Sequence, residues 1–295
     1  MPELDTVIRN AVVVTAADVF TSDIAIAGGV VAALGRDLGP ARRDIDAAGR
    51  YVLPGGIDAH CHFDQPMRGS VTLADDFLSG PISAAHGGTT TVVPFACQRE
   101  GQSVRAAVED YHRRAAGKPV IDYAFHLIVS DPTEDVLRRE LPALIAEGYS
   151  SFKIYTKIPN GVPGVETRLP ILFSEGVNQG RIDLGTFVAL TATNPAKLYG
   201  LYPRKGSIAV GADADLVIWD KDREVVIDND MLHHNCDYTP YAGLRVRGWP
   251  AVVLSRGEIV VEEGKLLAQP GQGRFLRCDR PAPARVVPPP AVISR

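Results

Sequence analysis

Two histidines separated by one residue are the first side chains in the sequence that could do chemistry. They are His60 and His62, in the run DAHCH that follows a glycine pair at residues 55–56. On a β-strand, residues i and i+2 point to the same face, so both imidazoles are expected to project together. Two imidazoles on one strand can hold a single zinc ion. An ordinary pair of histidines near a turn is the alternative interpretation.

Lys153 is the second candidate, because it lies within the apolar strand pattern SSFKIYT. A buried ammonium group is costly unless it is paired, neutralised or chemically modified. A neutral lysine amine can add carbon dioxide and become a carbamate, whose two oxygens can bridge metal ions. The alternative is a lysine at a strand end that extends its amine to solvent. The two histidines in the same region favour a metal-ligand interpretation.

These candidates lie in a middle region, residues 54–205, in which strand and helix patterns alternate. The strand patterns are GGIDAHCHF, TTTVVPFA, IDYAFHLIV and SSFKIYT, and only one long helical pattern follows them, at about 183–199. Strict alternation predicts parallel strands joined by helices, in an α/β fold. A complete (β/α)8 TIM barrel takes roughly 200 to 250 residues, so we expect an incomplete barrel-type domain here. The carboxyl ends of such strands are where barrels place active sites.

Two segments with β-strand patterns flank this region. Residues 1–53 and 206–267 are rich in valine, isoleucine and alanine and are punctuated by glycine, which is typical of short strands. We expect them to combine into one small composite β-sandwich. Residues 268–295 form a C-terminal tail with the proline-rich run PAPARVVPPPAVISR, which predicts irregular structure or a segment wrapped over a neighbour.

The overall composition narrows the class of ligand. The net charge is −4 without a lysine and arginine cluster, which disfavours nucleic acid and anionic membranes as partners. No apolar run approaches the roughly 18 to 20 residues that span a bilayer, and the first residues lack the pattern of a signal peptide. The four cysteines show no CxxC spacing, so we expect reduced thiols in a cytoplasmic protein. A small molecule is the expected ligand.

Six collinear motifs between about residues 5 and 267 together resemble the cyclic amidohydrolases of the amidohydrolase superfamily, in particular the dihydropyrimidinase and hydantoinase branch. They are LPGGIDAHCHFDQP, TLADDFLSGPISAAHGGTTTVVPFA, SSFKIY, IPNGVPGVETRLP, TATNPAKLYGLYPRKGSIAVGADADLVIWD and DYTPYAGLRVRGWP. The resemblance implies a metal-dependent (β/α)8 barrel beside a small β-sandwich. It also implies a hydrolase that acts on C–N bonds and opens dihydropyrimidine or hydantoin rings to N-carbamoyl amino acids.

The same resemblance implies roles for four residues. His60 and His62 match the two metal-binding histidines of the family, and Lys153 matches the carboxylated lysine that bridges two metal ions. Asn160, in the PNG loop, falls on a position whose backbone contacts the substrate. The implied cofactors are zinc and a carbamate on Lys153 formed from carbon dioxide.

The sequence departs from the family between the lysine strand and the PNG loop. Family members carry there two further histidine ligands and an aspartate that binds metal and transfers the proton, and these have no counterpart around the join at residues 156–159. His233 and His234 lie in a loop outside the barrel pattern and are not expected to replace them. We therefore expect at most one well-ligated metal ion, no retained proton-transferring residue, and activity below that of an intact relative.

Three functions stay open at this point. The first is a shortened cyclic amide hydrolase, the second is a non-catalytic relative that serves assembly, as collapsin response mediator proteins do, and the third is a structural remnant without a ligand. A partial barrel leaves unpaired strand edges, which favours a homo-oligomer, a dimer or tetramer, that covers them. The expected partners are thus a cyclic amide and further copies of the chain.

Overall fold

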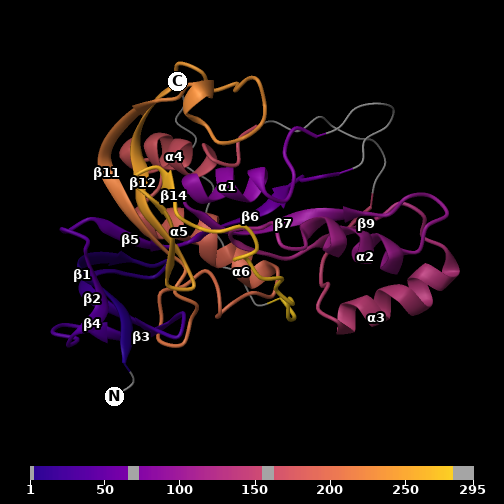
Figure 1. Ribbon diagram of the computed structural model, residues 1–295, viewed down its shortest axis with the longest axis horizontal. Coiled ribbons are helices and arrows are strands. Elements are labelled where there is room, and N and C mark those ends of the chain that lie inside the picture. Colours follow the sequence, from indigo (N-terminus) through magenta and orange to yellow (C-terminus); the bar gives the residue numbers. More distant parts are fainter. Residues whose placement is uncertain (1–2, 66–72, 155–162, 282–295) are drawn as a thin grey trace.

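The computed structural model describes residues 3–65, 73–154 and 163–281, which form two β-sheets with helices packed against them. In the view of Figure 1, the sheet built from both ends of the chain lies to the left. The sheet of the middle region extends to the right, toward helices α2 (Val104–Ala115) and α3 (Leu141–Ala146). The predicted α/β class is confirmed. None of the helices in the described ranges is long and apolar enough to cross a bilayer.

The first sheet has nine strands in the described residues, in the order β14-β13-β12-β11-β5-β1-β2-β3, with β4 paired to β1. The two ends of the chain meet where β5 and β11 pair antiparallel, from Leu216 opposite Pro54 to Trp219 opposite Tyr51. The strands are β1 (Leu4–Val14), β2 (Val19–Ala27), β3 (Val30–Gly35), β4 (Ala41–Asp46), β5 (Tyr51–Pro54), β11 (Leu216–Val226), β12 (Arg245–Ser255), β13 (Glu258–Glu262) and β14 (Lys265–Leu266).

Valine and isoleucine at the inward positions of these strands build one core. Ile8, Ile24, Leu216 and Leu254 come from four different strands, are fully buried and belong to the same apolar cluster. The hairpin between β2 and β3 turns on Gly28 and Gly29, whose φ angles are 59° and 82°, a conformation that glycine adopts without a steric penalty.

The predicted pairing of the two flanking segments therefore agrees with the structure. The nine strands form one continuous hydrogen-bonded sheet in the described residues, rather than two sheets with separate strand orders. Because strands at both ends of this sheet contribute to one core, the sheet curves around it. The two facing layers of a sandwich and the domain limits at residues 53 and 206 remain predictions.

The second sheet contains the strands of the middle region, in the order β10-β9-β7-β6, with β8 paired to β7. Every one of these pairings is parallel, as the alternating pattern predicts. Helix α1 connects β6 to β7, α2 connects β7 to β8, and a π-helical turn, η1, and α3 connect β9 to β10. The bounds are β6 (Gly56–Cys61), α1 (Ser79–His86), β7 (Thr89–Cys97), β8 (Asp122–Tyr123), β9 (His126–Val129), η1 (Val136–Glu140) and β10 (Phe152–Ile154).

The helices between residues 168 and 198 contact strands of both sheets, with α4, η2 and α5 against the nine-stranded sheet and η3 and α6 against β6 of the parallel sheet. The long helical pattern predicted at about 183–199 is confirmed, since α5, η3 and α6 follow one another without a break from residue 184 to 198. Asp183 caps this helix, because its carboxylate accepts a hydrogen bond of 2.6 Å from the Thr186 N–H. The helices are α4 (Arg168–Leu172), η2 (Phe173–Asn178), α5 (Leu184–Val188), η3 (Ala189–Thr193), α6 (Asn194–Leu198) and η4 (Asn229–Met231).

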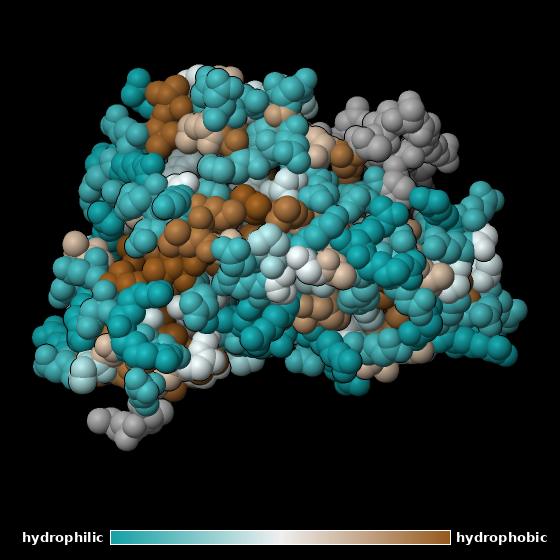
Figure 2. Space-filling view, in the orientation of Figure 1, coloured by the Kyte–Doolittle hydropathy of each residue, from teal (hydrophilic) through white to brown (hydrophobic). Residues whose placement is uncertain are grey.

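One face of the molecule carries a band of hydrophobic residues. Figure 2 shows this band crossing the region where β12 and β14 are labelled in Figure 1, with mostly hydrophilic residues around it. Contiguous apolar surface of this kind often marks a contact with another chain or molecule.

A buried lysine connects the two sheets. The Lys205 side chain is 1% exposed, and its ammonium nitrogen lies 2.7 Å from the Asp122 carboxylate and 2.7 Å from the Asp215 carboxylate. Asp213 is a third partner, at 2.9 Å. Asp122 belongs to β8 in the parallel sheet, whereas Asp213 and Asp215 immediately precede β11 in the nine-stranded sheet.

Arg256 completes this ion network from the turn between β12 and β13. Its guanidinium group bonds to Asp122, and its backbone N–H donates to Asp215 at 2.8 Å. Burial lowers the pKa of Arg256 to about 10. Two cations thus face three carboxylates at the junction of the sheets, and removal of one cation leaves buried negative charges unpaired.

We expect Lys205→Met to lower the free energy of unfolding by about 3–5 kcal/mol, because one partner of a buried ion network is lost. The matched control is Lys221→Met, which removes a lysine that is 45% exposed and pairs with Asp222 on the surface. Its effect should be much smaller, because solvent screens an exposed ion pair. Urea unfolding monitored by tryptophan fluorescence measures both. Equal effects of the two substitutions would contradict a central role for Lys205.

Candidate active site

The glycine pair before the two histidines allows β6 to approach its neighbours closely. A Cβ atom on Gly55 would lie 2.1 Å from the Thr90 hydroxyl of β7, and one on Gly56 would lie 2.7 Å from the Leu169 side chain of α4. Any larger residue at either position would push β6 away from β7 or α4. The glycines therefore set the position of the strand end that carries His60 and His62.

His60 and His62 lie at the carboxyl end of β6, with their ring centroids 5.5 Å apart. Both rings pack against Phe95 of β7, with centroid distances of 4.9 Å for His60 and 4.7 Å for the stacked His62 ring. The ammonium nitrogen of Lys153 lies 4.3 Å from the centre of the same Phe95 ring. Three side chains that the sequence predicts as metal ligands thus surround one phenylalanine.

Parallel strands explain why residues so far apart in the sequence meet there. Lys153 of β10 pairs in register with Ile128 of β9, and Phe95 of β7 pairs with His126 of β9. All four strands point the same way, so their carboxyl ends share one edge of the sheet. Asn160, the predicted substrate contact, lies outside the described residues.

His126 is a third imidazole in this cluster. Its ring centroid lies 4.9 Å from that of Phe95. Its Nε2–H donates to the Ala59 carbonyl at 2.8 Å, and the Ser151 hydroxyl contacts Nδ1. Burial lowers the pKa of His126 to about 4, with smaller contributions from His60 and Lys153. Both nitrogens are engaged, so a positioning role fits this residue better than metal ligation.

The protonation states of His60 and His62 suit metal binding. Burial lowers the pKa of each imidazole below its ordinary value, and the nearby Lys153 lowers both further. Asp58 opposes these shifts only in part, and it is itself held by an ion pair of 3.2 Å with Arg168. Neutral imidazole is the form that coordinates a metal ion. Both histidines are therefore ready to bind at neutral pH.

Gln65 orients the His62 ring. Its side chain is buried, its carbonyl oxygen accepts a hydrogen bond from His62 Nδ1–H, and its amide nitrogen donates to the Cys97 sulfur at 3.6 Å. Since Nδ1 carries the proton in this arrangement, the lone pair of Nε2 is left to bind a metal. The only sequence signal for this role is a glutamine three residues after the second histidine. The sequence does not reveal that this glutamine is buried and contacts His62.

Other residues near the histidines lie outside this cluster. Cys61, between the two histidines in the sequence, is buried in the large apolar core. His233 stacks on His86 with a centroid distance of 3.4 Å and bonds to Glu166 at 3.0 Å. Among the described residues His233 and His234 make no ring contact with Phe95, which agrees with the expectation that they do not complete the barrel site.

Comparisons with known proteins agree with this fold. Residues 160–260 match the model of the amidohydrolase family. A D-hydantoinase of Geobacillus stearothermophilus is 30% identical, over 92% of this chain and 96% of the relative. A solved D-hydantoinase from a Bacillus species superposes with a TM-score of 0.89 at 27% identity, over 95% of this chain and 100% of that one. A dihydropyrimidinase from Brevibacillus agri gives a TM-score of 0.84 at 27% identity, over 95% and 100% of the two chains.

The fold and these matches define a metal-dependent hydrolase of the amidohydrolase superfamily. Within that superfamily, the chain belongs to the hydantoinase branch, whose enzymes hydrolyse cyclic amides. The alignment with the Geobacillus relative runs over 452 positions, whereas this chain has 295 residues. The relative therefore contains segments that have no counterpart here.

We expect Gln65→Leu to lower the pKa of His62, because the hydrogen bond to Gln65 raises that pKa in the folded protein. Gln65→Glu should raise it, since a carboxylate accepts the same bond and stabilises the protonated ring. His60 serves as an internal control, because Gln65 does not contribute to its shift. NMR titration of the ring resonances in metal-free protein measures both histidines. A His62 pKa that is the same in both variants would contradict the assigned contact.

Proposed function

We propose that this chain binds one divalent metal ion through His60, His62 and a carbamate on Lys153, and that the bound ion promotes opening of a cyclic amide ring. The arrangement of these three side chains around Phe95 is the observation that carries the proposal. Zinc suits two imidazole nitrogens and a carboxylate-like oxygen. Dihydropyrimidines and hydantoins are the proposed substrates, and N-carbamoyl amino acids are the products.

The chemistry of these side chains fits a metal ion. Desolvation lowers the pKa of His60 and His62, and the contact of His62 Nδ1 with Gln65 leaves the Nε2 lone pair of His62 to bind the ion. Lys153 becomes a ligand when its amine loses a proton and adds carbon dioxide, which replaces a positive charge with a negative one. The resulting anion attracts a metal cation where the ammonium group would repel it, so metal binding and carbamate formation support each other.

A zinc ion held by His60, His62 and the Lys153 carbamate would supply an activated water at neutral pH and would polarise the amide carbonyl. The Phe95 ring packs against all three side chains and would exclude water from that side of the site. Ring opening adds one water across the C–N bond, so the nitrogen must gain a proton as the carboxylate forms. The family aspartate that transfers this proton has no counterpart here, and we therefore assign no described residue to this step.

We also propose that the middle region is a barrel interrupted near residues 156–159. In the described residues the parallel sheet is open, with β6 and β10 at its two edges, and the relative contains segments that this chain lacks. Open edges favour pairing with another strand. Together with the hydrophobic band of Figure 2, they support a homo-oligomer, a dimer or tetramer, of this chain.

The test compares the chain with a His60→Ala/His62→Ala double variant. We expect the double variant to lose one equivalent of zinc per chain, measured by elemental analysis, and to lose hydrolysis of dihydrouracil and of a 5-substituted hydantoin. His112→Gln, which changes a histidine of α2 that bonds to Tyr149, is the control and should keep both. Activity of the unchanged chain should lie about 10²-fold or more below that of an intact relative, since general acid–base groups contribute about 10²- to 10⁴-fold.

Each outcome discriminates between the functions. Loss of two zinc equivalents would contradict a single-metal site at these residues, and a double variant with the same zinc content as the unchanged chain would contradict the assigned ligands. Zinc binding without hydrolysis of either ring would indicate a non-catalytic relative that keeps the site.

A further inference from the structure

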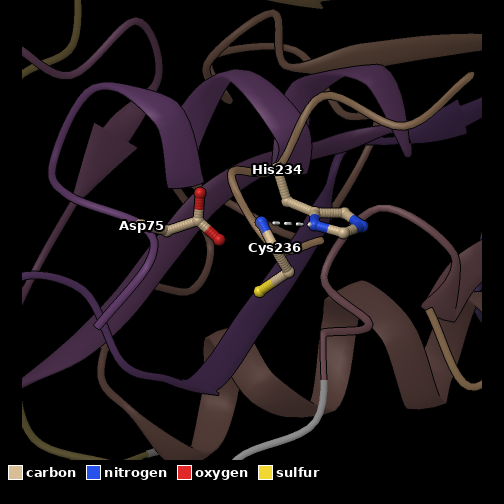
Figure 3. Close-up of side chains that lie close together, drawn as sticks. All are labelled: Asp75, His234 and Cys236. Carbon is tan, nitrogen blue, oxygen red and sulfur yellow. Dashed lines mark hydrogen bonds between the residues drawn. The ribbon is translucent and has the colours of Figure 1, made fainter. Parts of the chain in front are cut away.

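A second group of metal-ligating side chains lies outside the barrel site. It consists of Asp75, in the segment that leads into α1, and His234 and Cys236, in the loop that connects β11 to β12. One ligand atom from each of the three residues lies within 4.8 Å of the other two. Figure 3 shows the Asp75 carboxylate on one side of the Cys236 side chain and the His234 imidazole on the other. We propose that these three side chains bind a zinc ion.

The donor set is chemically suited to zinc. A thiolate, an imidazole and a carboxylate are its three common protein ligands, at bond lengths of about 2.0 to 2.3 Å. Ligand atoms on one tetrahedral ion therefore lie roughly 3.3 to 3.8 Å apart, so the three groups need to close by only about 1 Å. All three residues are partly exposed, which leaves a path for the ion and room for a water as the fourth ligand.

The Asp75 carboxylate is already oriented for this role. Its Oδ1 atom accepts hydrogen bonds from the Ser79 hydroxyl at 2.8 Å and from the Asn235 backbone N–H at 2.9 Å. In the part of the chain that the structure describes, Oδ2 accepts no hydrogen bond. Hydrogen-bond donors of this kind commonly orient metal-binding carboxylates. The Oδ1 atom of Asp75 is thus held in place, while its Oδ2 atom can coordinate a metal ion.

The histidine and the cysteine are held side by side by their own loop. The Cys236 backbone N–H donates to His234 Nδ1 at 3.0 Å, a bond that Figure 3 marks with a dashed line. The Nε2 atom of His234 is buried and has no hydrogen-bond partner among the described residues. A single hydrogen bond therefore restrains the His234 imidazole. A metal ion can take the place of the Cys236 N–H at Nδ1.

The position of the group indicates what a bound ion would do. Asp75 precedes the helix that follows the histidine strand β6, whereas His234 and Cys236 belong to a loop of the nine-stranded sheet. An ion shared by them would fasten this loop to the start of α1, close to the existing bond between Asn235 and Asp75. The site is thus a structural zinc clamp between the two parts of the fold, and it does not depend on the proposed hydrolysis.

The test uses the full chain with His60→Ala/His62→Ala, so that the barrel site does not bind metal, and cobalt(II) as a spectroscopic substitute for zinc. We expect one equivalent of cobalt to give the ligand-field bands of a tetrahedral ion and a thiolate-to-cobalt charge-transfer band. Cys236→Ser should abolish the charge-transfer band. Cys97→Ser, which removes the cysteine beside Gln65, is the matched control and should leave it unchanged.

Zinc affinity and thermal stability provide the second measurement. Asp75→Asn should weaken zinc binding at least about tenfold, and zinc should raise the melting temperature of the parent but not of the Cys236→Ser variant. Equal melting temperatures of the two proteins without metal would show that the serine variant is folded. The proposal is overturned if the parent binds no cobalt at one equivalent, or if its charge-transfer band survives in Cys236→Ser and disappears in Cys97→Ser.

Discussion

The ion network around Lys205 is the interaction on which the arrangement of the two sheets depends. A lysine that is almost completely buried faces carboxylates from β8 of the parallel sheet and from the start of β11 in the nine-stranded sheet. A buried charge that loses its partners is far more costly than a broken surface pair. The network therefore permits only a narrow range of positions for one sheet relative to the other. Helices α5 and α6 fill the space between them, and the strand ends of the candidate site sit in this frame.

Within that frame, the Phe95 ring organises the candidate site. Its two faces and edge receive His60, His62, His126 and the Lys153 ammonium, so one apolar side chain sets the spacing of four basic groups. The same packing desolvates the imidazoles and lowers their pKa values. The positive charge of the Lys153 ammonium opposes the binding of a metal cation by the neighbouring histidines. Conversion of Lys153 to a carbamate would remove that charge.

Membership of the hydantoinase branch explains what this chain retains and what it lacks. It keeps the first histidine pair, the lysine strand and the sheet formed by both chain ends, and its alignment with a Geobacillus D-hydantoinase still extends over 96% of that relative. The segments without a counterpart would supply, by resemblance, the remaining histidines and the aspartate. The Asp75, His234 and Cys236 group lies on residues that the chain does possess, and it brings the segment before α1 next to the loop between β11 and β12.

The sequence by itself determined the local features of this protein. The spacing of His60 and His62, the lysine within a strand and the alternation of strand and helix follow from periodicity and residue type, and they indicated the α/β class. The collinear motifs indicated the family by resemblance. Strand order and side-chain contacts between distant segments were decided only by the tertiary structure. The Gln65 contact with His62, the place of His126 beside Phe95, the order of the strands in the nine-stranded sheet, and the approach of Asp75 to Cys236 are examples. Such contacts depend on how whole strands and loops pack in space, and no short-range pattern in the sequence records that packing.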